Sequence, residues 1–191
     1  MNNNPNKQII IGIAVIVGIC LICCVTVGIV AVVGAPLLTE WAASQSQGVP
    51  PLQVGASAPD FELETLEGET IRLSQFRGQQ PVLLIFSASW CPACRAEAPL
   101  VQEVHEDHPE LVVLLVDLEE TASVAQGFAD EMGMTYPVLL DGNGRVGKLY
   151  HIYAIPASFF IDVDGILRAM LVSELTPDYL TKTFPLIGVT P

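Results

Sequence analysis

The chain has 191 residues, and its 8 basic and 21 acidic side chains give a formal charge of −13 at pH 7. Apolar residues make up 51% of it and charged residues only 15%, which excludes disordered and collagen-like chains and leaves room for about one domain with an appendage. The acidity also argues against a nucleic-acid partner, because the basic residues are scattered singly and form no patch that could neutralise phosphates.

Near the start of the chain, residues 9–38 predict a single transmembrane helix. They hold 24 apolar residues out of 30, and no charge falls between Lys7 and Glu40. About 20 apolar residues cross a bilayer as a helix, whereas the apolar part of the alternative, a cleaved signal peptide, is only about 7–15 residues long. The next basic residue after Lys7 is Arg72, so we expect residues 1–8 to be a cytoplasmic tail and the domain to lie outside the cell membrane.

Three cysteines, Cys20, Cys23 and Cys24, lie within this apolar segment. Thiols in hydrocarbon stay protonated and unreactive, so we interpret these as small apolar residues of the helix. Acylation, or a disulfide to a second copy of the chain, is the alternative.

Residues 39–54 are a predicted linker, because the composition changes there to Ser, Gln, Gly and Pro. Residues 55–191 are long enough for a single core. In chain order we expect a hairpin of strands 61–63 and 70–73, a strand over 82–86, a helix from 92 to about 105, a strand over 111–116, a helix over 122–132, a strand over 138–140, a short helix towards 150, a hairpin of strands 158–161 and 166–171, and a helix over 178–184. This order predicts an α/β fold whose mixed sheet is covered on both faces.

The chemistry is expected where the first buried strand meets its helix, in the run Ser-Trp-Cys-Pro-Ala-Cys-Arg over residues 89–95. Two residues between Cys91 and Cys94 at a helix start put both sulfurs within disulfide reach, and the helix dipole stabilises a thiolate there. We expect Cys91 to be the exposed nucleophile, with its pKa below the free value of about 8.5, and Cys94 to be the buried resolving thiol. Half of a zinc site is the alternative, but the domain has no second cysteine pair, so we predict no metal.

The domain resembles the thioredoxin superfamily, and within it the membrane-anchored extracytoplasmic thiol-disulfide oxidoreductases of the TlpA/ResA/CcmG type. The likeness covers essentially all of residues 55–180. Five motifs carry it: GASAPDF at 55–61, WCPAC at 90–94, RAEAP at 95–99, YPVLLD at 136–141 and IPASFFID at 155–162.

The resemblance implies a thioredoxin fold and roles for particular residues. Pro156 matches the family's cis-proline, which faces the cysteines and offers backbone groups to an extended substrate strand. Trp90 matches the aromatic residue that covers the site, and we assign Trp90, Pro92 and Ile155 to substrate contact.

Glu97 is the candidate proton acceptor. It stands three residues beyond Cys94, on nearly the same helix face, so a buried carboxyl there could take the proton of Cys94 during exchange. Many thioredoxins carry an acid on the preceding strand, but Ile85 occupies that position here. The alternative is a surface glutamate paired with Arg95 or with solvent.

Together these observations predict a membrane-anchored thiol-disulfide oxidoreductase that needs no cofactor, because the sulfurs carry the electrons. The resemblance implies client proteins with cysteine pairs, including apocytochromes in cytochrome c maturation. A reducing member would also need a membrane thiol-electron transporter to recharge it. Two alternatives stay open: a peroxide reductase of the same fold, and a non-enzymatic module whose disulfide is structural.

Overall fold

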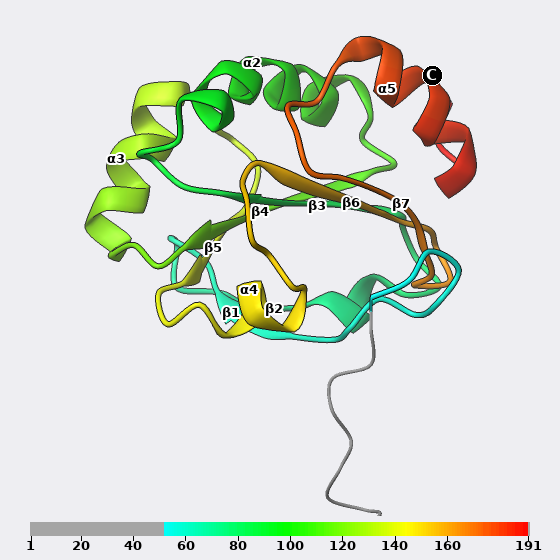
Figure 1. Ribbon diagram of the computed structural model, residues 1–191, viewed down its shortest axis with the longest axis horizontal. Helices are drawn as coiled ribbons and strands as arrows, with labels where there is room; N and C mark the ends of the chain where they lie inside the picture. Colours follow the sequence, from blue (N-terminus) through cyan, green and yellow to red (C-terminus); the bar gives the residue numbers. More distant parts are fainter. Residues whose placement is uncertain (1–51, 191) are drawn as a thin grey trace, which may run out of the picture. The chain divides into compact units, whose positions relative to one another are not determined.

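The central sheet has five strands in the order β5-β4-β3-β6-β7 (Figure 1). The computed structural model describes residues 52–190, so the predicted tail, transmembrane helix and most of the linker lie outside the described residues. The elements are β1 Glu62–Glu64, β2 Thr70–Arg72, η1 Leu73–Phe76, β3 Val82–Ser87, α2 Pro92–Asp107, β4 Val112–Leu118, α3 Ala122–Met132, β5 Val138–Asp141, α4 Arg145–Leu149, β6 Ala157–Ile161, β7 Leu167–Leu171, α5 Pro177–Thr183 and η2 Phe184–Ile187.

The sheet is mixed, as the order of elements predicts. Strands β3, β4 and β5 run parallel, while β6 pairs antiparallel with both β3 and β7. Parallel neighbours need helical crossovers, which α2 and α3 provide. From the carboxyl end of β3 the chain passes through a short loop, residues 88–91, into the first turn of α2.

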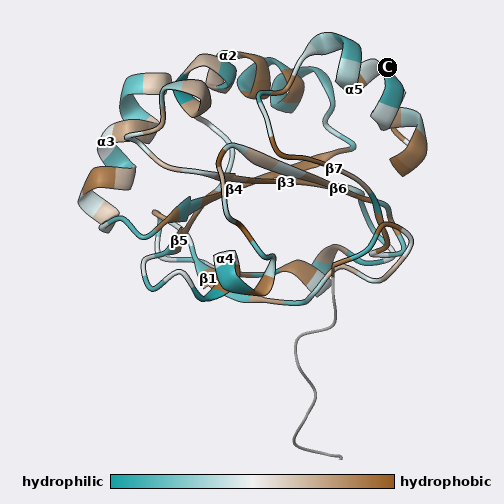
Figure 2. Cartoon of the chain, in the orientation of Figure 1, coloured by the Kyte–Doolittle hydropathy of each residue, from teal (hydrophilic) through white to brown (hydrophobic). Residues whose placement is uncertain are grey.

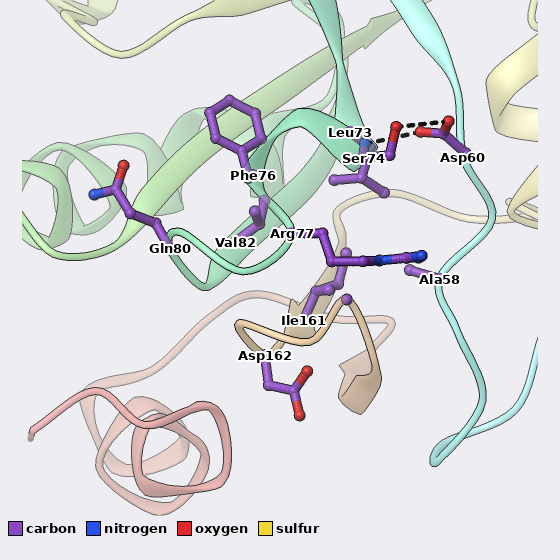
Figure 3. A pocket seen from close by; sticks show the side chains of 11 residues that line it. Ala58, Asp60, Leu73, Ser74, Phe76, Arg77, Gln80, Val82, Ile161 and Asp162 are labelled. Atoms are coloured by element: carbon purple, nitrogen blue, oxygen red, sulfur yellow. Dashed lines mark hydrogen bonds between the residues drawn. The ribbon is translucent and has the colours of Figure 1, made fainter.

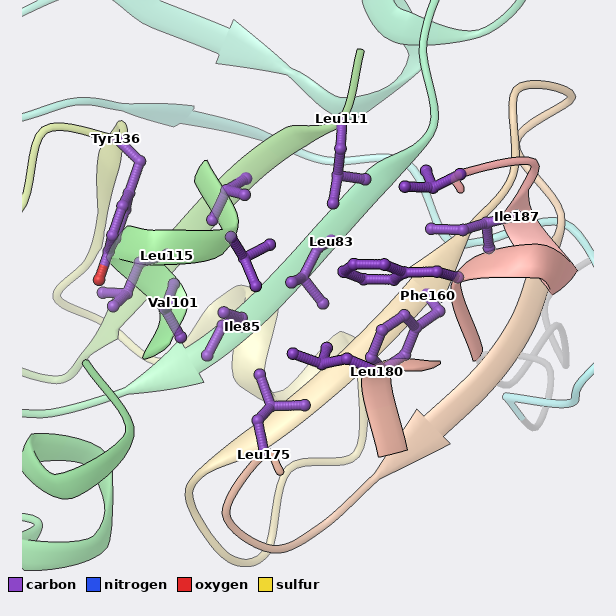
Figure 4. Packing of buried hydrophobic residues seen from close by; sticks show 14 of the residues in the cluster. Leu83, Ile85, Val101, Leu111, Leu115, Tyr136, Phe160, Leu175, Leu180 and Ile187 are labelled. Atoms are coloured by element: carbon purple, nitrogen blue, oxygen red, sulfur yellow. The ribbon is translucent and has the colours of Figure 1, made fainter. Parts of the chain in front are cut away.

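Two hydrophobic cores sandwich the sheet, because successive side chains of a strand point to opposite faces. Leu83 and Ile85 of β3 pack in the core beneath α2 and α5, which Figure 4 shows from close by. Leu84 and Phe86 pack in the other core, against η1, α4 and the β1–β2 hairpin. Figure 2 shows the consequence in hydropathy: the central strands are hydrophobic, and the outer helices carry hydrophilic residues on their surfaces.

Each outer strand of the sheet is paired along part of its free edge. Beyond β1, Thr65 bridges to Leu139 of β5. On the other side, residues 55–58 run along the start of β7, where Gly55 N donates to the Leu167 carbonyl at 2.7 Å and Leu167 N donates to the Ala56 carbonyl at 2.9 Å. These contacts leave less unpaired backbone available for association with other strands.

The entry to η1 is fixed by a carboxylate. Asp60 accepts hydrogen bonds from Ser74 N at 2.8 Å and from Ser74 Oγ at 2.9 Å (Figure 3). The hollow beside this pair has a volume of about 10 Å³, roughly the room that one water molecule needs. It is a packing feature and has no space for a larger ligand.

The thioredoxin-like α/β fold and the N-terminal hairpin expected from the sequence are confirmed in the described residues. The helix predicted over 122–132 is found with those bounds, and β4 extends two residues beyond its predicted end, to Leu118. Within residues 52–190, every helix is too short or too polar to cross a bilayer.

Candidate active site

Cys91 and Cys94 form a disulfide at the start of α2, with their Cα atoms 5.3 Å apart. Cys91 is the N-cap residue and Pro92 is the first residue of the helix, where its missing N–H costs no hydrogen bond. Cys94 N donates to Cys91 Sγ at 3.2 Å. The unpaired amides of this helix end, together with the helix dipole, favour negative charge on Cys91 when the disulfide is reduced.

The predicted exposure of Cys91 is wrong for this oxidised form. Cys91 is 4% exposed and Cys94 is 2% exposed, so both residues are buried. The cause is a second loop, because Cys91 Sγ lies 3.7 Å from the carbonyl oxygen of Ile155.

That second loop contains the cis peptide bond between Ile155 and Pro156. The chain thus brings together two segments 64 residues apart: the start of α2 and the turn that enters β6. Pro156 is buried, Ile155 is partly buried and Pro92 is exposed. The segments predicted to contact substrate therefore meet at one end of the sheet.

A groove of about 660 Å³ lies next to these two loops. Trp90 and Ile155 line it, together with Leu118, Lys148 and Tyr153. Trp90 is 68% exposed and Tyr153 is 90% exposed, so Trp90 forms part of an open groove wall.

Glu97 is a buried acid in α2, one helical turn beyond Cys94 and 5% exposed. Its Oε2 atom accepts a hydrogen bond from Leu175 N at 2.8 Å. Burial raises the pKa of Glu97 to about 7, the charge of Glu174 adds to the rise, and the Leu175 hydrogen bond opposes it. Such a carboxyl can hold or release a proton near neutral pH.

The alternative interpretation of Glu97, a surface residue paired with Arg95, is wrong. Arg95 instead forms an ion pair with Glu131 of α3 and donates from Nη1 to the carbonyl of Ser89 at 3.2 Å. Ile85, at the strand position where many thioredoxins carry an acid, packs in the core beneath α2.

Sequence reasoning missed two further acids near this site, Asp117 and Glu120. Asp117 is fully buried in β4, and Glu120 accepts hydrogen bonds from Ser89, two residues before Cys91. The sequence did carry a signal for Asp117. The strand expected over residues 111–116 is an unbroken apolar run, and Asp117 is the charged residue that directly follows it. In the sheet, Asp117 lies level with Ser87 at the end of β3, the strand that leads to Cys91. A charged residue in such a place is a candidate site residue.

Within residues 52–190, no three His, Cys, Asp or Glu side chains are grouped so as to hold a metal ion. The chemistry available at this site is that of the two sulfurs and the nearby carboxyl groups.

Comparisons with known proteins agree with this geometry. The model of the AhpC/TSA family matches residues 54–170. The thiol-disulfide oxidoreductase ResA of Oceanobacillus iheyensis is 37% identical over 134 residues, which are 67% of this chain and 69% of that protein. The crystal structure of StoA from Bacillus subtilis is 31% identical with a TM-score of 0.57, covering 67% of this chain and 97% of that one. A secreted thiol-disulfide isomerase from Corynebacterium glutamicum is 25% identical with a TM-score of 0.62, covering 72% and 94%.

A CxxC disulfide that begins the helix after the first strand of this sheet, next to a cis-proline loop, defines a thiol-disulfide oxidoreductase of the thioredoxin fold. The relative named thiol-disulfide oxidoreductase ResA supports the same class. The chain belongs to the AhpC/TSA family, and its similarity to ResA makes it a ResA-like member.

Proposed function

We propose that this protein is anchored in the cell membrane by residues 9–38, holds residues 55–191 outside it, and reduces disulfides in client proteins. The observation that carries the exchange chemistry is the Cys91–Cys94 disulfide at the start of α2, beside Ile155 and Pro156. The proposed location is supported by the uncharged apolar segment and by the lack of basic residues between it and Arg72.

The first step uses reduced Cys91. Its thiolate, favoured by the start of α2, attacks one sulfur of a client disulfide. A mixed disulfide forms between Cys91 and the client, and the second client sulfur leaves as a thiolate that takes a proton from solvent. The client remains attached through one sulfur until Cys94 acts.

The second step uses Cys94 and Glu97. The Cys94 thiol gives its proton to the Glu97 carboxylate, and the resulting thiolate attacks the Cys91 sulfur of the mixed disulfide. The Cys91–Cys94 bond forms as the bond to the client breaks, and the client sulfur leaves as a thiolate that takes a proton from solvent. Two electrons have then passed to the client. A carboxyl with a pKa of about 7 suits this task, because it is partly ionised at neutral pH.

The client would bind over the cis-proline loop and the adjacent groove. The Ile155 carbonyl adjoins Cys91 Sγ, and the residues on either side of Cys91 in the sequence, Trp90 and Pro92, are both exposed. Exposed aromatic residues are enriched where proteins bind one another. An extended client strand seated against Pro156 would bring its own disulfide to Cys91.

Client reduction in a compartment where disulfides persist needs a supply of electrons. We therefore include a membrane thiol-electron transporter as the partner that re-reduces the Cys91–Cys94 disulfide. By family resemblance, one client class is apocytochromes whose cysteine pairs must be reduced before haem attachment.

The deciding experiment is the redox equilibrium of the full chain, in a mild detergent, across graded glutathione buffers. The Cys91–Cys94 bond is followed by mass spectrometry of its own peptide, which separates it from Cys20, Cys23 and Cys24. A potential near or below about −270 mV supports the reductant, whereas one near about −120 mV indicates an oxidant that makes disulfides.

Two variants test the residue roles. Cys91→Ser should abolish exchange with a model disulfide and leave the fold intact; normal exchange in that variant would refute the assigned nucleophile. Glu97→Gln should remove a step near pH 7 from the pH dependence of exchange, and an unchanged profile would refute its role as proton acceptor. The alternative function, peroxide reduction, is tested on the unsubstituted protein, which should consume peroxide no faster than a free thiol does.

The orientation is tested by adding protease to intact cells that produce the full chain. Residues 55–191 should be digested while a cytoplasmic marker survives. Protection of the domain until the membrane is broken would refute the proposed orientation.

A further inference from the structure

Ser89, two residues before Cys91, is held by a single carboxylate. Ser89 N donates to Glu120 Oε2 at 2.6 Å, and Ser89 Oγ donates to Glu120 Oε1 at 2.7 Å. Glu120 lies between β4 and α3, 31 residues further along the chain. Both carboxylate oxygens accept from the loop that presents the reactive sulfur, so the hydrogen bonding assigns the charged form to Glu120.

The carbonyl of Ser89 is held as well. Arg95 Nη1 donates to it at 3.2 Å, and the same guanidinium pairs with Glu131 and lies 5.4 Å from the ring centroid of Phe128. Glu131 and Phe128 belong to α3. The loop before Cys91 is thus held in place by contacts to α3 and to Glu120, in the turn that precedes α3.

Asp117 stands opposite Ser87 at the end of β4, and no N–H or O–H group of the described residues donates a hydrogen bond to either of its carboxyl oxygens. It is fully buried at the end of β4, where its strand neighbours are the uncharged Ser87 and Leu140. A bare carboxylate in that position is costly, because burial without a partner disfavours charge. Burial raises the pKa of Asp117 to about 7, and the charge of Glu120 and a hydrogen bond between the two side chains add to the rise.

We propose that Asp117 and Glu120 share one proton and act together as positioning residues for the active-site loop. Asp117 keeps the proton and donates it to Glu120, and Glu120 uses its remaining lone pairs to accept both hydrogen bonds from Ser89. Loss of that proton would place a second negative charge behind the loop that carries Cys91. The inference deepens the function proposed above and rests on exchange through Cys91.

The other ionisable groups around Asp117 are accounted for. On β5, Asp141 accepts from Gly147 N of α4 at 2.8 Å, and it belongs to the opposite face of the sheet because strand residues alternate. On α2, Arg95 is paired with Glu131, while Glu97 binds the Leu175 amide. Burial raises the pKa of Glu97 to about 7 as well, so Glu97 is replaced by Gln throughout the test.

The test measures the pH dependence of Cys91 alkylation in the reduced full chain, by mass spectrometry of the Cys91 peptide, with Glu97→Gln present throughout. Asp117→Asn keeps a donor for Glu120 but cannot ionise. Asp130→Asn, on the exposed side of α3, removes the same charge as a matched control.

With Asp117 present, alkylation should rise over a wider pH range than a one-proton curve, because the emerging carboxylate opposes ionisation of Cys91. Asp117→Asn should give a one-proton curve and, at pH values below the thiol pKa, a rate up to about threefold higher, as expected when the thiol pKa falls by roughly half a unit. Asp130→Asn should match its parent. Coincident curves for the two variants would overturn the proposal.

A second variant and a direct titration keep the proposal testable if Asp117→Asn fails to fold. Glu120→Gln cannot accept both Ser89 hydrogen bonds with its amide, so exchange should slow at every pH, by about threefold or more. Carboxyl NMR of the parent protein should show Asp117 titrating near pH 7; titration at or below its usual value would also overturn the proposal. If the unsubstituted chain exchanges no disulfide through Cys91, the proposed function itself fails, and that outcome is distinct from coincident alkylation curves.

Discussion

Replacing Glu97 by Gln should stabilise the oxidised protein, and only at neutral and alkaline pH. In the folded chain the Glu97 carboxyl is buried on the inner face of α2, and this burial raises its pKa from 4.5 to about 7. The folded state therefore binds more protons than the unfolded state between those values, so stability falls as pH rises from about 4.5 to 7 and is then constant. The folded protein gives up about 3 kcal/mol to ionise this group.

The glutamine amide that replaces the Glu97 carboxyl can still accept the Leu175 hydrogen bond and cannot ionise. The difference in free energy of unfolding between Glu97→Gln and the parent should therefore grow by up to about 3 kcal/mol between pH 4 and pH 8. Urea denaturation of the oxidised proteins at both pH values measures it. Glu103→Gln, at an exposed position of α2, is the matched control and should show no such growth.

The comparison cancels contributions that both proteins share, including the titration of Asp117. A difference that is the same at pH 4 and pH 8 would refute the reasoning, because it would mean that Glu97 is ionised as readily in the folded chain as in the unfolded one. The proposed proton transfer from Cys94 would then lose its physical basis.

Four further substitutions test the fold. Gly144→Ala should cost about 1 kcal/mol or more, because Gly144 is the N-cap of α4 and has φ +65°. Gly127→Ala, in the middle of α3 with open space around it, should instead stabilise the protein by about 0.5–1 kcal/mol. Phe160→Ala should cost about 3–5 kcal/mol, because the ring is fully buried in the core beneath α5. Tyr150→Phe should cost about 1 kcal/mol through loss of the 2.7 Å hydrogen bond to the Pro59 carbonyl. Denaturant midpoints of the oxidised variants measure all of these, and a Gly144→Ala variant as stable as Gly127→Ala would contradict the backbone argument.

The elements of this fold could be predicted from the sequence because each is signalled locally. Buried strands such as β3 are unbroken apolar runs, and Pro92 after Cys91 indicates a helix start. The likeness to the thioredoxin superfamily indicated where the cis bond before Pro156 would fall, and that bond is present. Local pattern and family likeness together thus predicted both segments that meet at the disulfide.

The contacts between distant segments could not be predicted in the same way. Cys91 is buried because the Ile155 carbonyl packs against its sulfur, and no pattern near residue 91 records that approach. The bond from Ser89 to Glu120 likewise joins residues in different loops. Glu97 is an intermediate case: helical spacing correctly indicated a buried carboxyl, but its partner, the Leu175 amide, lies 78 residues away.

The pairing of residues 55–58 with the start of β7 has a practical consequence for handling the protein. Ile161 of β6 pairs with Val82 and Leu167, so Leu167 lies at the end of the sheet where β3 begins, opposite the end where β3 leads to Cys91 (Figure 1). The first described residues therefore lie at the end of the sheet remote from Cys91. A fusion partner, affinity tag or solid support joined before residue 52 attaches to that remote end, so we expect it to leave the disulfide accessible to large clients.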